Sequence, residues 1–310
     1  MADLLSRKTL ILAAVEAAYG TPETLVGADA ILCSNAELTP IAGGTTSRDF
    51  YRDYLGASPE IHIKSHVMLA FDVELAGSGT AGTPPGWGTL LRGCGFDETI
   101  NGIIDVTYDL LSTGFEGLTI ECYIDGQRHR LFGCRGNAVL NYAAGEIPKI
   151  RFTFTGLWVD PATAPPPVAD FSAFKAPIPG SNVNTPTFTL HSTSTYRLYN
   201  LSIDLGNAVS HVDIVNEETI LLTDRNVRGS ITLAAEALST FNPFTIAKAN
   251  TLGNFVLQHG TAAGYINTIN GPKVQLLEPT YGDQDGRRTI SANIVFTPDS
   301  GNDEIQLVLT

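Results

Sequence analysis

The sequence is poor in cysteine and has no cysteine motif. Its four cysteines, Cys33, Cys94, Cys122 and Cys134, all lie in the first half without CxxC or CxxH spacing. That pattern indicates neither a zinc site nor a thiol redox motif. A chain of 310 residues can build a core without disulfides, so we expect reduced, buried thiols in a protein made in a cytosol.

Long hydrophobic runs and an excess of basic residues are missing too. No stretch approaches the roughly 18 apolar residues of a membrane span, and the N-terminal region has acidic residues but no small-residue cleavage site. We therefore expect no membrane association and no signal peptide. The 19 basic and 32 acidic residues give a formal charge of −13, the wrong sign for gripping a phosphate backbone.

What the sequence does contain is typical of a turn-rich β fold. Only 16% of residues are charged, against 30 glycines and 17 prolines. Apolar residues alternate with polar ones in several segments, and a period of two predicts strands with one buried face. These segments are 61–75, 149–159, 198–205, 288–296 and 304–309. Helical patterns are scarce, and the candidates are 87–94, 242–250 and 7–18.

No catalytic, metal or cofactor site emerges from the motifs, so we expect no enzyme and no cofactor. Ser78 sits in a Gly-rich loop (77–86) that lacks GxSxG and phosphate-loop patterns. His62 and His66 are both on a predicted strand, roughly 13 Å apart, too far to share a metal ion. The acidic stretch 283–286 lacks the downstream glutamate of a calcium loop and predicts a hairpin turn.

A proline-rich segment divides the chain. Residues 161–186 hold seven of the 17 prolines, which leaves few backbone donors for a sheet. We therefore predict a first β domain at 1–164 with an N-terminal arm, a linker at 165–186, and a second β domain at 187–310. Both domains read in the same order: a strand, a variable stretch, a long strand or strand pair, a short helix, another strand and a closing hairpin. We interpret this as one unit used twice.

One polar segment carries exposed aromatic and basic residues. Within 46–57 stand Arg48, Phe50, Tyr51, Arg52 and Tyr54, outside any strand pattern. Aromatics with arginines on a long loop are typical of protein interfaces. The alternative is a loop folded onto its own domain.

The segment FDVELAGSGTAGTPPGWGTLLRGCGF (71–96) resembles a signature of phage tail tube proteins, in which a strand and a Gly/Pro loop precede a helix of the type xLLRACG. Leu90, Leu91, Arg92, Gly93, Cys94 and Gly95 supply that helix. NLSIDLGNAVSHV (200–212) and TDRNVRGSITLAA (223–235) also look like tube-protein strands. The resemblance implies a mainly β fold of two tandem tail-tube-type β-sandwich or barrel domains, each with a short flanking helix. The doubling and the proline-rich linker depart from the usual single unit.

The resemblance also implies a virion protein of the phage tail, made in the host bacterial cytoplasm, that assembles with itself. Two units per chain predict a trimeric ring with pseudo-sixfold symmetry, and stacked rings would form a tube through which DNA passes without specific binding. Three chains at −13 each carry −39, so we expect a negatively lined channel that repels DNA. The segments 61–75 and 219–235 are candidates for inner-sheet strands.

For contacts between rings the candidates are the loops 41–60 and 77–86. Their residues are Arg48, Phe50, Tyr51, Arg52, Tyr54, Ser78, Thr80 and Pro84. Expected partners are the tape-measure protein in the channel, the tail terminator and the distal tail proteins. The alternative function is a tandem β-sandwich carbohydrate-binding or adhesin protein. The low number of tryptophans, only two, and the lack of an evident secretion signal argue against it.

Overall fold

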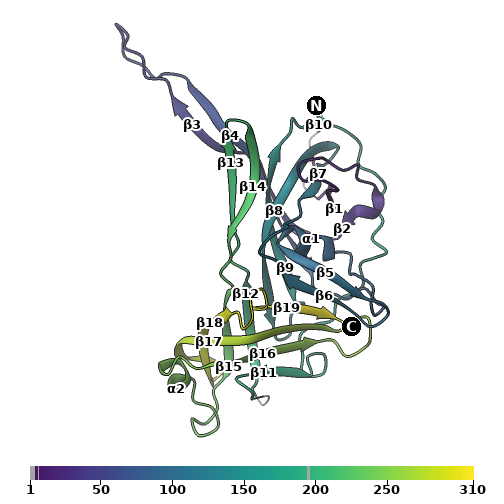
Figure 1. The fold of residues 1–310 in the computed structure, drawn as a ribbon, viewed down its shortest axis with the longest axis vertical. Coiled ribbons are helices and arrows are strands. Elements are labelled where there is room, and N and C mark those ends of the chain that lie inside the picture. The colour runs from purple at the N-terminus through teal and green to yellow at the C-terminus, as the bar shows by residue number, and fades with distance from the viewer. Residues whose placement is uncertain (1–3, 6, 194–195) are drawn as a thin grey trace.

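The computed structural model describes residues 4–5, 7–193 and 196–310, so residues 1–3 and 6 of the predicted N-terminal arm lie outside the described residues. The fold is mainly β, with antiparallel strands in β-sandwich layers and two short α-helices. A long hairpin projects from one end of an elongated body (Figure 1). The mainly β fold predicted from the alternating segments is therefore confirmed.

The first half of the chain holds ten strands and one α-helix among the described residues. They are β1 (Thr9–Val15), β2 (Ala30–Ile31), β3 (Ser34–Ser47), β4 (Glu60–Glu74), α1 (Gly88–Gly93), β5 (Phe96–Asn101), β6 (Asp105–Leu110), β7 (Leu118–Ile124), β8 (Gln127–Ala143), β9 (Lys149–Trp158) and β10 (Ala162–Thr163).

The described part of the second half holds nine strands and one α-helix. They are β11 (Thr187–Leu190), β12 (Leu198–Asp204), β13 (Ala208–Ile214), β14 (Glu217–Asp224), β15 (Arg228–Ala234), α2 (Pro243–Lys248), β16 (Leu252–His259), β17 (Asn267–Gln284), β18 (Arg287–Thr297) and β19 (Gln306–Leu309).

Strand pairing follows the same order in both halves. In the first half the antiparallel ladder runs β3–β4–β9–β8–β7–β1. In the second half it runs β12–β15–β18–β17–β16–β11. An α-helix follows β4 in one ladder and β15 in the other. Two junctions join the halves of the chain, because β8 pairs with β12 and β6 pairs with β19.

Two of the predicted helices are confirmed. α1 lies within 87–94 and buries Leu90 and Leu91. α2 lies within 242–250; its N-cap residue Asn242 accepts a hydrogen bond from the Thr245 N–H, and Pro243 occupies the first turn. The turn at 283–286 is also confirmed, because it closes the β17–β18 hairpin with Asp285 and Gly286 at positive φ.

Two expectations about local structure are wrong. Residues 7–18 form no helix, because Thr9–Val15 is a buried strand paired along its whole length with β7. The run TLILAAV is apolar without a period, and such a run does not distinguish a buried strand from a buried helix. Residues 219–235 are not one strand either, since β14 ends at Asp224 and β15 begins at Arg228.

One hydrophobic core extends through both halves. In the first half it centres on Phe71, Phe152 and Phe154, whose rings lie 6.0–6.1 Å apart between centroids. The Trp87 indole is buried in the same core and donates to the Ala76 carbonyl at 2.8 Å. All four cysteines are free thiols, and three of them are buried. Burial raises the pKa of the Cys33 thiol to about 11 and that of Cys122 to about 12.

The proline-rich segment follows the surface of the body and is attached at several points. The Asp170 N–H donates to the Gly27 carbonyl at 2.8 Å, and Gly180 exchanges backbone hydrogen bonds with the turn at 145–146. Further along, Thr185 Oγ1 lies 3.0 Å from the Nδ1 of buried His259. Of the residues between 165 and 186, none belongs to a strand in the described structure.

Candidate assembly surfaces

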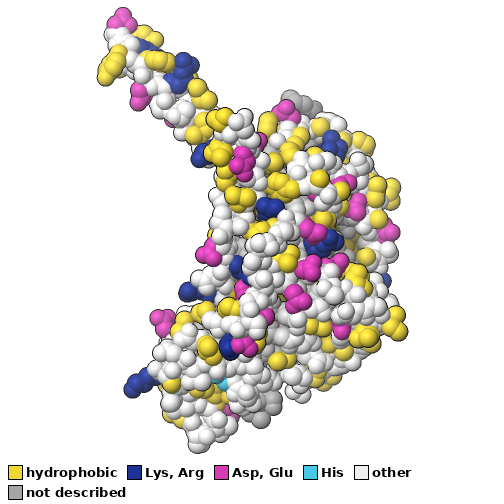
Figure 2. Space-filling view, viewed as in Figure 1, with side chains coloured by type: hydrophobic (Ala, Val, Ile, Leu, Met, Phe, Trp, Pro, Cys, Tyr) yellow, Lys and Arg dark blue, Asp and Glu magenta, His cyan; other side chains and the backbone are white. Residues whose placement is uncertain are grey.

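The β3–β4 hairpin extends beyond the body as an arm, residues 42–65, because β9 pairs with β4 only from His66 onward. The alternating Ile61 and Ile63, which would face a core in a buried strand, are 49% and 40% exposed here. Hydrophobic and charged side chains both lie along the arm (Figure 2). An exposed apolar hairpin of this length is typical of a surface that becomes covered on assembly.

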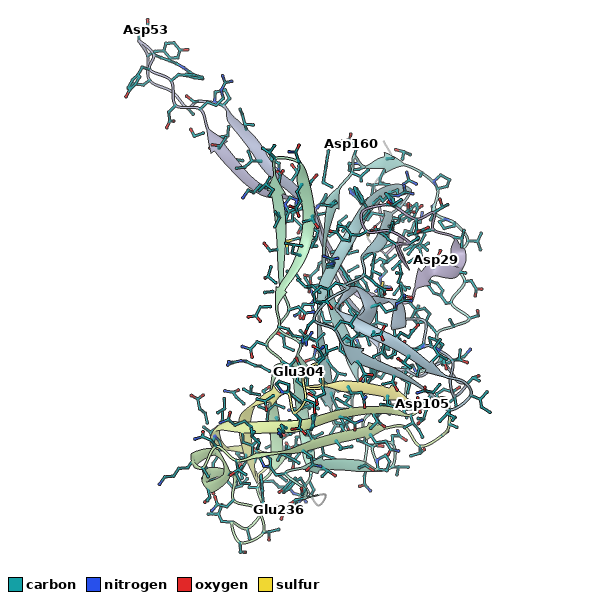
Figure 3. The ribbon with its side chains drawn as sticks, in the orientation of Figure 1. Asp29, Asp53, Asp105, Asp160, Glu236 and Glu304 are labelled. Carbon is teal, nitrogen blue, oxygen red and sulfur yellow. The ribbon has the colours of Figure 1, made fainter. Side chains whose placement is uncertain are left out.

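The tip of the arm, residues 48–59, holds five of the predicted contact residues. Arg48 lies over the Phe50 ring at 4.8 Å and Arg52 over the Tyr54 ring at 5.6 Å. Tyr51 is fully exposed, and Asp53 marks the far end in Figure 3. The contacts found among the described residues of the tip are with the tip or the adjoining strands. The loop therefore does not fold back onto the body.

The other predicted contact residues lie elsewhere, on the loop 77–86. The Gly79 N–H donates to the Gly264 carbonyl at 2.9 Å, which holds this loop against the second half of the chain. Ser78 and Pro84 are half-buried, and Thr80 is exposed. The structure thus brings Arg48 to Tyr54 together at the tip, and keeps Ser78, Thr80 and Pro84 together at a second place.

A polar sheet face runs across the junction between the halves. Residues that alternate with core residues on β4, β9, β8, β12 and β15 line a hollow of about 730 Å³. Arg151 reaches Asp72 at 3.0 Å and Glu37 at 2.9 Å across it, and the hydrogen bond to Asp72 contributes most to raising the pKa of Arg151. Acidic residues on this face include Glu37, Asp72, Glu74, Asp204 and Glu278, and basic ones include Lys149, Arg151 and Arg228.

A contact that sequence reasoning missed fastens the β13–β14 hairpin onto the first half. The Arg135 guanidinium donates to the Ile220 carbonyl at 2.7 Å and lies 4.3 Å from the centre of the Tyr19 ring. The Tyr19 hydroxyl accepts from the Ile220 N–H at 2.7 Å. Burial lowers the pKa of Arg135, and buried Glu16 lies nearby, accepting from the Gly133 N–H. Ile220 is 201 residues from Tyr19 and 85 residues from Arg135 in the sequence, so no local pattern could have indicated these contacts.

The residues of the helix motif act in packing. Arg92 forms a bidentate pair with Glu116, with both N···O distances 2.6 Å. A side chain at Gly93 would meet Leu118 at 2.6 Å, so only glycine fits between α1 and β7. The motif therefore fixes the helix against the sheet, and none of its residues, 90–95, is exposed.

In the described residues, no group of three or more His, Cys, Asp or Glu side chains is arranged to hold a metal ion. No helix in the described part of the chain is long and apolar enough to cross a membrane.

Comparison with known proteins identifies a protein family. A family model described as phage tail tube protein matches residues 6–298. A search of the curated proteins finds no match to the chain.

Proposed function

The chain belongs to the phage tail tube protein family, and from this premise we propose that it forms the tube by assembling into closed rings that stack along the tail axis. As a family member it is a structural component of the virion tail that assembles with itself and with other tail proteins. The observation that carries the proposal of rings is the pair of ladders with the same strand order, joined through β8 and β12.

The repeated order also supports a division into two tube domains. The proposed bounds are 1–164 and 187–310, with the proline-rich linker 165–186 between them. If each domain fills one of the six positions usual in a tube ring, three chains close the ring with pseudo-sixfold symmetry. Stacking then joins the two different faces of successive rings, a heterologous contact that extends into a filament.

The polar sheet face is the candidate wall of the channel. It includes more carboxylates than cations, and each ring of three chains carries −39 overall, three times the formal charge of −13. A wall with a negative surplus repels phosphates, and the interspersed Lys149, Arg151 and Arg228 keep the field moderate. DNA would then pass during ejection without binding tightly.

The arm tip and the loop 77–86 are the candidate contacts between rings. The tip carries exposed aromatic residues and arginines, the residue types enriched in interfaces. The tape-measure protein would occupy the channel during assembly, with the tail terminator and distal tail proteins at the two ends. The host cytoplasm is the proposed place of synthesis.

Electron microscopy of the purified full chain tests this function. We expect rings or tubes with a central hole, and class averages with three-fold symmetry that approaches six-fold at low resolution. Monodisperse particles at every protein concentration and salt condition would contradict the proposal, and binding of such particles to glycans would favour a carbohydrate-binding protein instead.

A further inference from the structure

Two strand edges on opposite halves of the chain are unpaired. In the described structure β3 pairs with β4 alone, and β17 beyond Leu277 pairs with β18 alone. Side chains along both edges are exposed or half-buried, with Tyr281 54% exposed. A free edge presents backbone donors and acceptors and therefore pairs readily with another strand, although Pro40 on β3 and Pro279 on β17 have no N–H to donate.

The junction inside the chain shows how such edges are paired here. In the first ladder, β8 pairs with β7 through its first part and with β12 through Val139–Ala143. β17 has the position of β8 in the second ladder, and β3 has the position of β12 in the first. We propose that the end of β17 in one copy pairs antiparallel with β3 of the next copy. This inference rests on the proposed ring and specifies its interface.

The closing hairpins fix which residues of β17 correspond to those of β8. Ile150 on β9 and Ile290 on β18 are both buried and occupy the same place in their ladders. Ile150 faces Leu140, and Ile290 faces Tyr281. Tyr281 is therefore the counterpart of Leu140.

The neighbouring strands fix the correspondence of β3 with β12. Ile150 pairs with Val73 on β4, and Ile290 pairs with Leu233 on β15. Four residues before these partners stand Leu69 on β4 and Gly229 on β15. Leu69 faces Leu38, and Gly229 faces Ile203. Leu38 is therefore the counterpart of Ile203.

Within the chain Ile203 faces Leu140, so Leu38 of one copy faces Tyr281 of the next. The same register places Thr39 opposite Thr280 and Glu37 opposite Gly282. Half-buried Leu38 would then cover part of the exposed Tyr281 side chain. Paired threonines suit a sheet, and glycine opposite Glu37 leaves room for the longer side chain.

The hydrogen-bond pattern identifies the closest side chains. At the internal junction the Leu205 N–H donates to the Ala138 carbonyl at 3.1 Å, and the Ala144 N–H donates to the Tyr199 carbonyl at 2.9 Å. Because hydrogen-bonded and non-hydrogen-bonded pairs alternate, the pair corresponding to Thr39 and Thr280 is non-hydrogen-bonded. Such pairs have Cα atoms about 4.5 Å apart, within the range of a disulfide.

The experiment is disulfide trapping in the full chain with Thr39→Cys and Thr280→Cys combined. Mild oxidation during assembly should convert most of the protein into covalent dimers and closed trimers on a non-reducing gel. Glu37→Cys with Gly282→Cys is a second pair in the same register and should give the same products. The single variants measure any background from the native cysteines, of which Cys33 is the most accessible.

A register-shifted pair, Leu38→Cys with Thr280→Cys, is the matched control. Successive residues point to opposite faces of a sheet, so this pair should not cross-link. Tubes seen by microscopy without a cross-link in either in-register pair would overturn the proposed pairing and leave the tube function standing, as would stronger cross-linking of the shifted pair. If neither rings nor tubes form, both proposals fail.

Discussion

At the scale of single residues, His259 connects the proline-rich segment to β16 and makes stability depend on pH. The imidazole is buried, with Nδ1 3.0 Å from Thr185 Oγ1 and Nε2 3.1 Å from the Ile178 carbonyl. Desolvation lowers its pKa below the usual 6.5. As the pH falls, the unfolded chain therefore takes up this proton before the folded chain does. The stability that neutral His259 contributes is fully present above about pH 6.5 and is lost as the pH falls through the lowered pKa.

His259→Gln should reduce this loss of stability. We expect the urea midpoint of the unmodified chain to fall between pH 7.5 and 5.5, and that of the variant to fall less, because one buried proton-binding group is gone. His129 and His191, whose pKa values are also lowered by burial, account for the remaining dependence. His62→Gln, on the exposed arm, is the control and should leave the slope unchanged. An equal fall in the unmodified and His259→Gln chains would contradict the assignment.

The sequence predicts the surroundings of a side chain only where the residues that determine them lie nearby in the chain. Exposed Tyr51 and Tyr54 could be predicted, because the surrounding polar residues offer no core face. Tyr19 and Arg135 could not, because their partner Ile220 is brought to them only by the tertiary fold. The sequence does not distinguish an arginine that becomes buried from one that stays exposed.

At the scale of elements, the proposed contacts for ring closure and for ring stacking lie at different places along the β3–β4 hairpin. The proposed edge pairing uses residues 37–39 at its base, whereas the tip lies beyond Ser47. Deletion of residues 46–57 removes most of the tip and leaves residues 58–61 to connect Thr45 with His62, which already face each other. We expect soluble, folded protein that forms rings and no longer forms tubes in negative-stain images.

The control for this deletion is Val168→Ala, which removes an exposed apolar side chain on the linker, far from the arm in sequence. That variant should give tubes of ordinary length. Tubes of ordinary length from the deletion variant would show that the tip is dispensable for stacking.

Elements were predictable where one physical signal dominated. β4, β9 and β18 show clear alternation because one face is buried and the other is polar. β1 is apolar throughout, so periodicity could not identify it as a strand. The β13–β14 hairpin turns at Asn216, which has a φ of 69°, but its strands alternate poorly because little of either face is buried.

At the scale of the whole molecule, the order of elements could be predicted to repeat, whereas the junction could not. Sequence order alone does not say that β12 pairs with β8, because any free edge of suitable length was available. That pairing is what extends one sheet across both halves and gives the chain a continuous polar face.

The proposed negative charge of the channel wall can be tested by reversing it on this face. Glu74→Lys with Glu278→Lys would place six new cations in each ring of three chains, and lysines bind phosphates by displacing counterions. We expect DNA release from particles with this tube to be slower at low salt and to recover partly as salt is raised. Asp97→Lys with Asp160→Lys changes the net charge equally at exposed carboxylates outside the polar face, and should release DNA at the ordinary rate. Because the two variants differ only in where the charge lies, equal release rates would exclude this face as the wall that DNA passes.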